Sequence, residues 1–266
     1  MSIEPVLLVE KRGEVDWVSL NRPDKLNAFN EELVSSLFDY FNGLASDDSV
    51  RVVVLKANGR AFCAGLDFSP DAFSTNERTP NRILSLQKKI ADIYRAMRRC
   101  PQPIIALVQG AACGGGFSLA LASDIRIAGE SAKMNAAYIT IGLTGCDMGS
   151  SYFLPRLVGT SVASELLLTG RFIEAPRALA VNLVSQVVPD VELDDAAQNF
   201  VDDMLRTNPL GLRLTKDGLN LGVDANSLDA AMAVEDRQQT LLALTEDSQE
   251  GASAFFAKRA PNFKNR

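Results

Sequence analysis

Short apolar runs alternate with helical periodicities over the first two thirds of the chain. Residues 50–55 and 104–108 are almost continuously apolar and rich in β-branched side chains, which is typical of strands covered on both faces. Asn30 is a good N-cap, and the apolar residues that follow it recur at helical spacing. This alternation predicts an α/β fold. The runs that predict strands are residues 6–10, 15–20, 50–55, 104–108, 124–128 and 181–188.

Helical periodicity is clearest in the middle and at the end of the chain. The predicted helices begin after Asn30 and then cover residues 83–100, 117–122, 148–157, 161–169, 194–205 and 228–243. Between residues 62 and 79 the periodicity is lost, which predicts a long loop of the kind that is often functional. After Asp190 the chain is mostly helical and more charged. We therefore expect a β/α core over residues 1–200 and a helical region over residues 201–266.

The composition is that of a soluble globular protein. Of the 266 residues, 47% are hydrophobic and 23% charged, enough for a sizeable core. The net charge of −6 argues against nucleic-acid binding, and no signal peptide or membrane span is visible. The four cysteines contain no C-x-x-C pair, so we expect no metal site and no disulfide framework. A reducing cytoplasmic location fits these cysteines best.

The chain contains no histidine. A Ser-His-Asp or Cys-His nucleophile, a histidine metal ligand and a histidine proton shuttle are therefore excluded. Any acid-base chemistry must depend on a carboxylate, tyrosine, lysine or cysteine side chain.

Two glycine-bearing segments follow predicted strands, at residues 60–67 and 110–116. The second contains three consecutive glycines directly before a predicted helix, where backbone amides are free to bind an anion. Amides from both segments would together form an oxyanion hole. The alternative is that the glycines only permit close packing of helix and strand.

Five motifs in these and neighbouring segments resemble the crotonase superfamily, the enoyl-CoA hydratase/isomerase family. They occur in the family's order and cover nearly the whole chain. They are NRPDKLNA at residues 21–28, FCAGLD at 62–67, the glycine run from 110 ending in SDI at 123–125, PRLVG at 155–159 and AFFAKR at 254–259.

The resemblance implies a spiral of ββα turns with a helical C-terminal trimerisation region. It further implies a homotrimer or dimer of trimers that acts on acyl-CoA thioesters in fatty acid metabolism, with coenzyme A as part of the substrate and no other cofactor. The oxyanion-hole amides would be those of Leu66 and Gly115, with Gly114 beside them.

The same resemblance assigns residues to the coenzyme. Family members bind its adenine and pantetheine parts through residues that match Lys25, Leu26, Ala64 and Asp67. Phe255 and Lys258 match positions that close over the coenzyme. Judged from the residues alone, both lysines would be read as solvated surface charges.

The chain departs from the family at both catalytic glutamates of a typical hydratase, which align with Ser118 and Tyr138. Neither hydroxyl holds a catalytic proton near neutral pH. Gly114, Ser118 and Tyr138 are instead candidate substrate-binding residues: Tyr138 could orient water or substrate, with a buried structural tyrosine as the alternative interpretation. The carboxylate that remains is Asp147, which matches the acidic residue of single-acid enoyl-CoA isomerases and the nucleophile of 4-chlorobenzoyl-CoA dehalogenase. Its apolar neighbours predict a raised pKa, although Asp147 could instead cap the next helix.

These observations favour isomerase-type chemistry, in which Asp147 moves a proton while the amides stabilise a thioester enolate. Hydrolytic relatives use a histidine that this chain lacks. Two alternatives stay open: covalent acyl-aspartate chemistry at Asp147, and a non-catalytic acyl-CoA-binding subunit. Asp71 and Glu77 are candidates for a second carboxylate, although solvated loop charges are the simpler interpretation. We expect residues 68–80 and the helix starting near residue 81 to line the acyl pocket.

Overall fold

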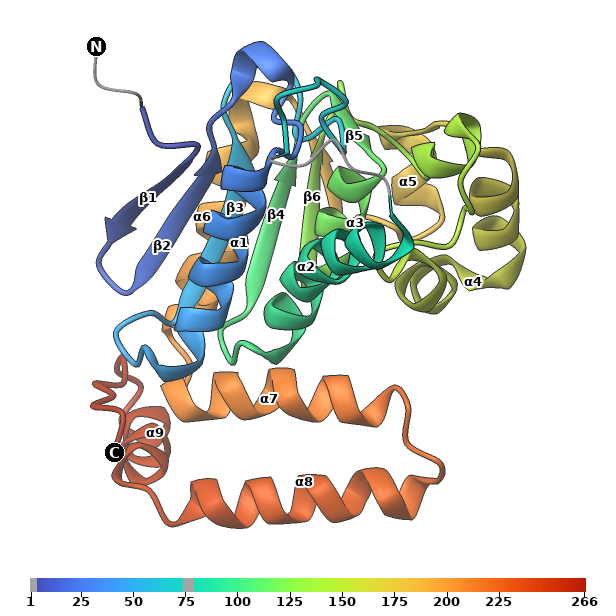
Figure 1. Cartoon of the computed structure of the whole chain (residues 1–266). Helices are drawn as coiled ribbons and strands as arrows, with labels where there is room; N and C mark the ends of the chain where they lie inside the picture. The colour runs from blue at the N-terminus through green and yellow to red at the C-terminus, as the bar shows by residue number, and fades with distance from the viewer. Residues whose placement is uncertain (1–3, 74–78) are drawn as a thin grey trace.

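The computed structural model describes residues 4–73 and 79–266. A six-stranded sheet with the order β1-β2-β3-β4-β6-β9 forms its centre (Figure 1). β1 is antiparallel to β2, and the other neighbouring strands are parallel. The carboxyl ends of β3 and β4 therefore lie at the same edge of the sheet, where both glycine-bearing segments begin. The strands are β1 Leu7–Arg12, β2 Val15–Leu20, β3 Val52–Ala57, β4 Ile104–Val108, β6 Ile125–Gly129 and β9 Gln186–Val188.

A second, three-stranded sheet has the order β5-β7-β8 and consists of Ala111–Cys113, Lys133–Asn135 and Ile173–Glu174. β5 belongs to the glycine-rich segment and continues directly into helix α3, Gly115–Ala122. Every residue of α3 is buried. The small sheet thus fixes the start of α3 at the edge of the core.

Helices cover both faces of the large sheet. Val53 and Leu55 of β3 are buried in the core on the side of α1, Glu31–Gly43, and α2, Pro80–Arg99. Val52 and Val54 point the other way, into a second apolar cluster that includes residues of α6, Leu193–Leu205. The expectation of strands buried on both faces is confirmed.

Local signals predicted several element boundaries. The Leu33 amide donates to the Asn30 side chain at 3.0 Å, so the predicted N-cap is confirmed. The two helices expected at residues 148–157 and 161–169 are confirmed: both are part of α4, Ser150–Thr169, which is interrupted by non-helical backbone at Gly159, where φ is 76°.

The strand predicted at residues 181–188 is wrong over its first five residues. Helix α5, Ala175–Ala180, ends in a turn in which Asn182 has φ 62°, and only Gln186–Val188 pairs in the sheet. Leu183 and Val184 are nevertheless buried in the core. Their apolar character reflects burial of a turn, which an apolar run alone does not distinguish from a buried strand.

Three helices, α7 Pro209–Gly222, α8 Leu228–Ala243 and α9 Glu246–Phe256, lie below the core in Figure 1. Only α8 had been predicted as a separate helix. The division expected after residue 200 falls inside α6, which packs on the sheet through Leu193, Ala197 and Val201. Among the described residues, no helix combines the length and the apolar character needed to cross a bilayer.

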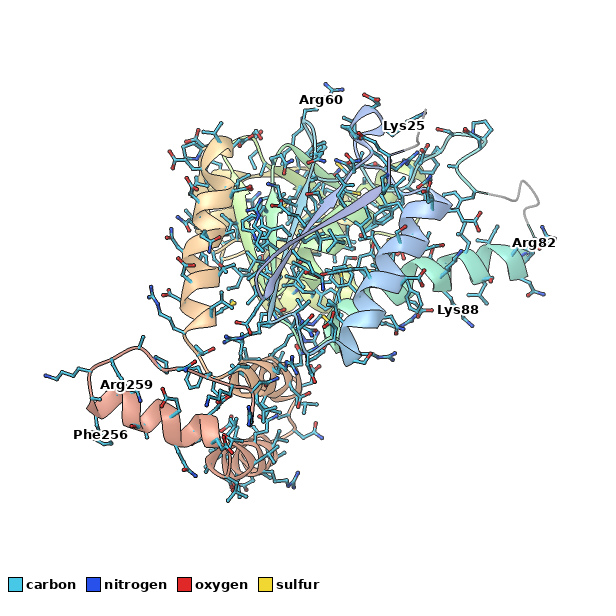
Figure 2. The ribbon with its side chains drawn as sticks, turned by 90° about the vertical axis from the view of Figure 1, so that its left-hand side faces the viewer. Lys25, Arg60, Arg82, Lys88, Phe256 and Arg259 are labelled. Carbon is cyan, nitrogen blue, oxygen red and sulfur yellow. The ribbon has the colours of Figure 1, made fainter. Side chains whose placement is uncertain are left out.

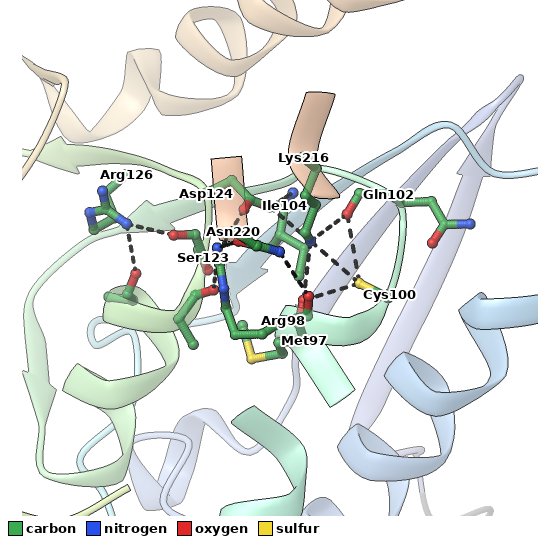
Figure 3. A network of polar contacts seen from close by, with 12 residues as sticks. Met97, Arg98, Cys100, Gln102, Ile104, Ser123, Asp124, Arg126, Lys216 and Asn220 are labelled. Atoms are coloured by element: carbon green, nitrogen blue, oxygen red, sulfur yellow. Dashed lines mark hydrogen bonds and ion pairs between the residues drawn. The ribbon is translucent and has the colours of Figure 1, made fainter. Parts of the chain in front are cut away.

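A buried lysine attaches α7 to the core (Figure 3). The Lys216 ammonium donates to the carbonyls of Gln102 at 2.8 Å and Met97 at 3.1 Å, and lies 2.9 Å from the Asp124 carboxylate. Asp124 also pairs with Arg98 at 2.7 Å. These contacts join α7 to the end of α2 and to the start of β4 and β6.

We expect Lys216→Met to lower the free energy of unfolding by about 2 kcal/mol, because two buried carbonyls lose their donor while Asp124 keeps Arg98. Chemical denaturation measures the loss. The matched control is Lys89→Met, which removes an exposed pair with Glu31 at 3.4 Å and should cost less than about 1 kcal/mol. Equal losses in the two variants would contradict a structural role for Lys216.

Candidate active site

The two glycine-bearing segments lie side by side. The Cys63 amide donates to the Ala111 carbonyl at 3.1 Å, and the Cys113 amide donates to the Cys63 carbonyl at 2.9 Å. This short ladder places residues 63–65 against β5 and the start of α3. A Cβ atom on Gly65 would lie 3.6 Å from the Gly115 amide nitrogen, so the two segments meet at the predicted amides.

The amides of Leu66 and Gly115 have no acceptor among the described residues. In both peptide units the carbonyl, which lies on the opposite side from the N–H, accepts a hydrogen bond. The Gly65 carbonyl accepts from the Phe29 amide at 2.7 Å, and the Gly114 carbonyl accepts from the Ser118 amide at 3.0 Å. Because both of these peptide bonds are trans, each N–H points away from its bonded carbonyl. Two unpaired donors are thereby held at adjacent positions.

Steric crowding also explains why glycine occupies positions 115 and 116. A Cβ on Gly116 would lie 2.1 Å from the Cys63 carbonyl oxygen, and one on Gly115 would lie 2.7 Å from the Phe29 ring. Close packing, the alternative interpretation of the glycine run, therefore applies to both residues. It coexists with the unpaired Gly115 amide.

Asp147 lies half-buried just before α4. Its Oδ1 accepts hydrogen bonds from the Met148 amide at 2.7 Å and from the side chain of Gln87 on α2. Oδ2 has no hydrogen-bond partner within the described part of the chain. Burial raises the pKa of Asp147, and the two hydrogen bonds offset part of this increase. The direction predicted from its apolar neighbours is confirmed.

Asp147 does not cap α4 with its side chain. The N-cap is Gly149, with φ 82° and no side-chain cap. The Ser150 amide donates instead to the Asp147 main-chain carbonyl at 2.8 Å. The capping interpretation is therefore wrong.

Ser118 and Tyr138, which occupy the positions of the two hydratase glutamates, contact each other. Their hydroxyl oxygens are 2.6 Å apart, and the Tyr138 hydroxyl donates to the Gly114 carbonyl at 3.0 Å. Both side chains are buried. Burial raises the pKa of Tyr138 well above its ordinary value, and the charge of Asp147 adds to the increase. The pair is neutral and adjoins the Gly115 amide.

Two neighbours of the site were not identified as such from the sequence. Tyr94 on α2 donates to the Gly115 carbonyl at 2.9 Å and lies 3.2 Å from the Met148 sulfur. Gln87, one of the contacts of Asp147, lies two turns earlier on α2. No local pattern distinguishes Gln87 from a solvated glutamine.

The residues assigned to the coenzyme by resemblance fall in two places. Leu26 and Ala64 are adjacent, since the Ala64 amide donates to the Leu26 carbonyl at 2.9 Å. Lys25 is exposed beside them, in a short 3-10 helix, Pro23–Lys25. Asp67 is buried and pairs with Arg22 at 3.0 Å. Burial raises the pKa of Asp67, but hydrogen bonds from Ser69 and Arg22 outweigh this and leave it lowered.

Phe255 and Lys258 lie elsewhere. Phe255 is 78% exposed near the end of α9, and Lys258 follows that helix. Figure 2 shows this end of the chain, at Phe256 and Arg259, at the opposite end of the molecule from Lys25. A single chain therefore does not bring these residues to the Lys25 side. Their closure over a coenzyme stays a prediction.

The expectation that residues 68–80 line the acyl pocket stays a prediction, because residues 74–78 lie outside the described part of the chain. Asp71 is exposed, in accordance with a solvated charge, and Glu77 lies outside the described residues. A cavity of about 610 Å³ opens between α2, α4 and α7, with Tyr94 and Met148 in its lining. Of these two, Tyr94 donates to the Gly115 carbonyl, and the Met148 backbone amide donates to Asp147.

Comparisons with known proteins identify the family of the chain. The family model for enoyl-CoA hydratase/isomerase matches residues 10–266. "Probable enoyl-CoA hydratase echA12" of Mycobacterium bovis is 39% identical, covering 98% of this chain and 93% of that protein. The "1,2-epoxyphenylacetyl-CoA isomerase" of Escherichia coli is 35% identical, covering 92% and 93%. The crystal structure of an enoyl-CoA hydratase from Bacillus anthracis has a TM-score of 0.92 at 31% identity, covering 98% and 100%.

The chain therefore belongs to the enoyl-CoA hydratase/isomerase family of the crotonase superfamily. It is an enzyme of that family, and the family implies an acyl-CoA thioester as its substrate.

Proposed function

We propose that this enzyme isomerises the acyl group of an enoyl-CoA thioester, with Asp147 as the only proton carrier. One observation carries the proposal: the site has a half-buried carboxylate with a free Oδ2, while the two hydratase acid positions form a neutral hydroxyl pair. Relatives are named both hydratase and isomerase, so the names alone do not choose between the two reactions.

The amides of Leu66 and Gly115 bind the thioester oxygen in this mechanism. Removal of a proton beside the thioester moves negative charge onto that oxygen, and two fixed donors stabilise the charge more in the enolate than in the ground state. Loss of one such donor in other enzymes costs about 100- to 1,000-fold in turnover.

Asp147 moves the proton. Its ionised Oδ2 takes a proton from the carbon next to the thioester of a 3-enoyl-CoA, and the electron pair of that C–H bond becomes part of a dienolate. The protonated Asp147 then returns the proton two carbons further along the chain, which gives the 2-enoyl-CoA. Proton and electrons balance without water. Hydration would need a further group to activate water, and Ser118 and Tyr138 are poorly suited to that role.

Exposed apolar side chains near the site favour an apolar acyl group. Ile83 and Leu84 are 54% and 52% exposed, one turn before Gln87 on α2, and Phe68 next to Asp67 is 70% exposed. Lys25, Leu26, Ala64 and Asp67 would hold the coenzyme, as the family resemblance implies. No cofactor besides coenzyme A is required for this chemistry.

The proposed enzyme is a homotrimer or a dimer of trimers. Helix α8 buries no residue within the chain, although it carries Leu228, Met232 and Leu241. Leu228 is 74% exposed, and Leu244 beyond the helix is 79% exposed. Apolar surface of this kind is typical of subunit contacts. Sedimentation equilibrium should give three or six times 28.7 kDa, and a monomer would contradict the proposal.

Covalent catalysis is the second candidate, because the free Oδ2 of Asp147 would also serve as a nucleophile. An acyl-aspartate adduct found by mass spectrometry of a quenched reaction would favour it over isomerisation. A purely binding subunit would bind acyl-CoA but turn over none of a panel of 2-enoyl-, 3-enoyl- and dienoyl-CoA thioesters.

The pH dependence tests the proposed role of Asp147. Because Asp147 must be ionised to accept a proton, kcat/KM should fall as pH drops through its raised pKa, above the ordinary aspartate value of about 3.9. In Gln87→Leu this acid limb should move to higher pH, since the lost hydrogen bond favours the charged form. Gln109→Leu, whose amide donates to the Ala57 carbonyl at 2.7 Å, is the control. An acid limb that stays in place in Gln87→Leu would contradict the assignment.

A further inference from the structure

The Gly114 carbonyl and the Gly115 amide belong to one peptide unit. A hydrogen bond to that carbonyl acts on the amide in two ways: it fixes the direction of the N–H, and it polarises the peptide so that the N–H becomes a stronger donor. Helix α3 supplies one such bond, from the Ser118 amide at 3.0 Å. The Tyr138 hydroxyl supplies a second at 3.0 Å.

The donor and the acceptor of each hydrogen bond around the Tyr138 hydroxyl can be assigned. Since the Gly114 carbonyl is only an acceptor, the one hydroxyl hydrogen of Tyr138 is used on it. The Ser118 hydroxyl, 2.6 Å away, must then donate to Tyr138. The result is a chain from Ser118 through Tyr138 to the carbonyl, and each bond polarises the next.

The surroundings keep this chain intact. Ser118 is 0% and Tyr138 5% exposed, so water does not compete for the hydroxyls. Burial raises the pKa of Tyr138, and the phenol therefore stays protonated and remains a donor. A Cβ on Gly114 would lie 3.5 Å from the Tyr138 ring, which shows that the ring packs on the peptide that it bonds.

From this geometry we propose that Tyr138, supported by Ser118, is a positioning residue that orients and polarises the Gly114–Gly115 peptide for binding of the thioester oxygen. The inference rests on the proposed function. The two positions that carry acids in a typical hydratase thus strengthen the oxyanion hole in this enzyme. Neither side chain exchanges a proton with the substrate.

A spectroscopic probe separates this role from simple packing. Cinnamoyl-CoA has an absorption band that moves to longer wavelength when its thioester carbonyl is polarised. Binding to the wild-type enzyme should produce this red shift. In Tyr138→Phe the ring still packs on Gly114 but the donor is lost. We expect a smaller red shift, a kcat about tenfold lower and a dissociation constant for cinnamoyl-CoA changed by less than about threefold.

Three further variants complete the experiment. Ser118→Ala should reduce the red shift less than Tyr138→Phe, and the double variant should be no worse than Tyr138→Phe alone, because the two hydroxyls act in series. The control is Tyr152→Phe, which removes the hydroxyl of a 42% exposed tyrosine bonded to Asp224. It should bind with the wild-type spectrum.

The outcomes distinguish this inference from the proposed function. A full red shift with wild-type kcat in Tyr138→Phe would overturn the role of Tyr138 and leave the isomerase proposal standing. Conversely, a red shift that is present in the wild type and reduced in Tyr138→Phe supports the inference, even if the enzyme isomerises no enoyl-CoA. Absence of turnover by the wild type overturns only the proposed reaction. If Tyr138→Phe unfolds, a full red shift in Ser118→Ala overturns the inference.

Discussion

Asp147→Asn should lower the isomerisation rate by about 100- to 10,000-fold, the usual contribution of a general acid-base group. The substitution is conservative in structure. The asparagine Oδ1 can still accept from the Met148 amide and from Gln87, and only the free Oδ2 becomes an amide nitrogen. Binding of a non-reacting acyl-CoA, measured by calorimetry, should change by less than about threefold.

The stability of this variant gives an internal check. Since the folded-state pKa of Asp147 is raised, its charge opposes folding at pH values above that pKa, and the penalty disappears as pH falls through the window between the folded and unfolded values. Asp147→Asn should therefore unfold at the same or a higher temperature than the wild type at neutral pH. Asp71→Asn in the exposed loop is the control for turnover. Full activity of Asp147→Asn on 2-enoyl-, 3-enoyl- and dienoyl-CoA would refute the assignment.

Gly65→Ala should reduce turnover by at least about 100-fold, the effect of losing one oxyanion donor. Gly65 has φ 93°, which an alanine adopts only with strain, and the new Cβ would lie 2.8 Å from the Cys113 carbonyl oxygen. Relief of this contact must move either the Leu66 amide or the segment that leads to Gly115. Either movement disturbs the pair of unpaired donors.

Gly13→Ala provides a matched control for backbone strain. Gly13 has φ 63° in the turn between β1 and β2, with open space around its would-be Cβ. Both variants should lose stability, by about 1–2 kcal/mol from strain alone in Gly13→Ala. Thermal unfolding gives the folded fraction of each variant, and kcat is then calculated per folded molecule. Only Gly65→Ala should have a reduced kcat after this correction. Unchanged kcat in folded Gly65→Ala would exclude Leu66 from the oxyanion hole.

Local signals account for much of the fold. The strands β2 and β4 and helix α8 begin and end at the predicted residues, because each is bounded by clear turn or capping residues. The prediction failed at residues 181–185, where apolar side chains pack from a turn. It also missed α7 as a separate helix. Lys216, which attaches α7 to the core, has its partners more than 90 positions away in the sequence.

For the candidate site too, some features could be predicted from the sequence and others could not. The two glycine-bearing segments could be placed together from the sequence, because the carboxyl ends of neighbouring parallel strands share one edge of a sheet. The contact between Gln87 and Asp147 could not, since it joins two segments 60 positions apart without a local pattern. The hydrogen bond between Ser118 and Tyr138 likewise depends on how α3 packs against the 3-10 helix Ala137–Ile141. Substitution of both hydratase acids was visible in the sequence, but the role of their replacements was not.

The central claim is that Asp147 exchanges a proton with the carbon next to a thioester held by the two amides. Mass spectrometry of an acyl-CoA incubated with the enzyme in D₂O measures that exchange directly. The proton held by the half-buried Asp147 carboxyl can exchange with D₂O before it is returned to the substrate. Wild-type enzyme should therefore introduce deuterium next to the thioester and, with a 3-enoyl-CoA, at the carbon two positions further along as well, in competition with direct return of the original proton. Asp147→Asn should introduce neither at a measurable rate. Exchange by Asp147→Asn at the wild-type rate would contradict the claim.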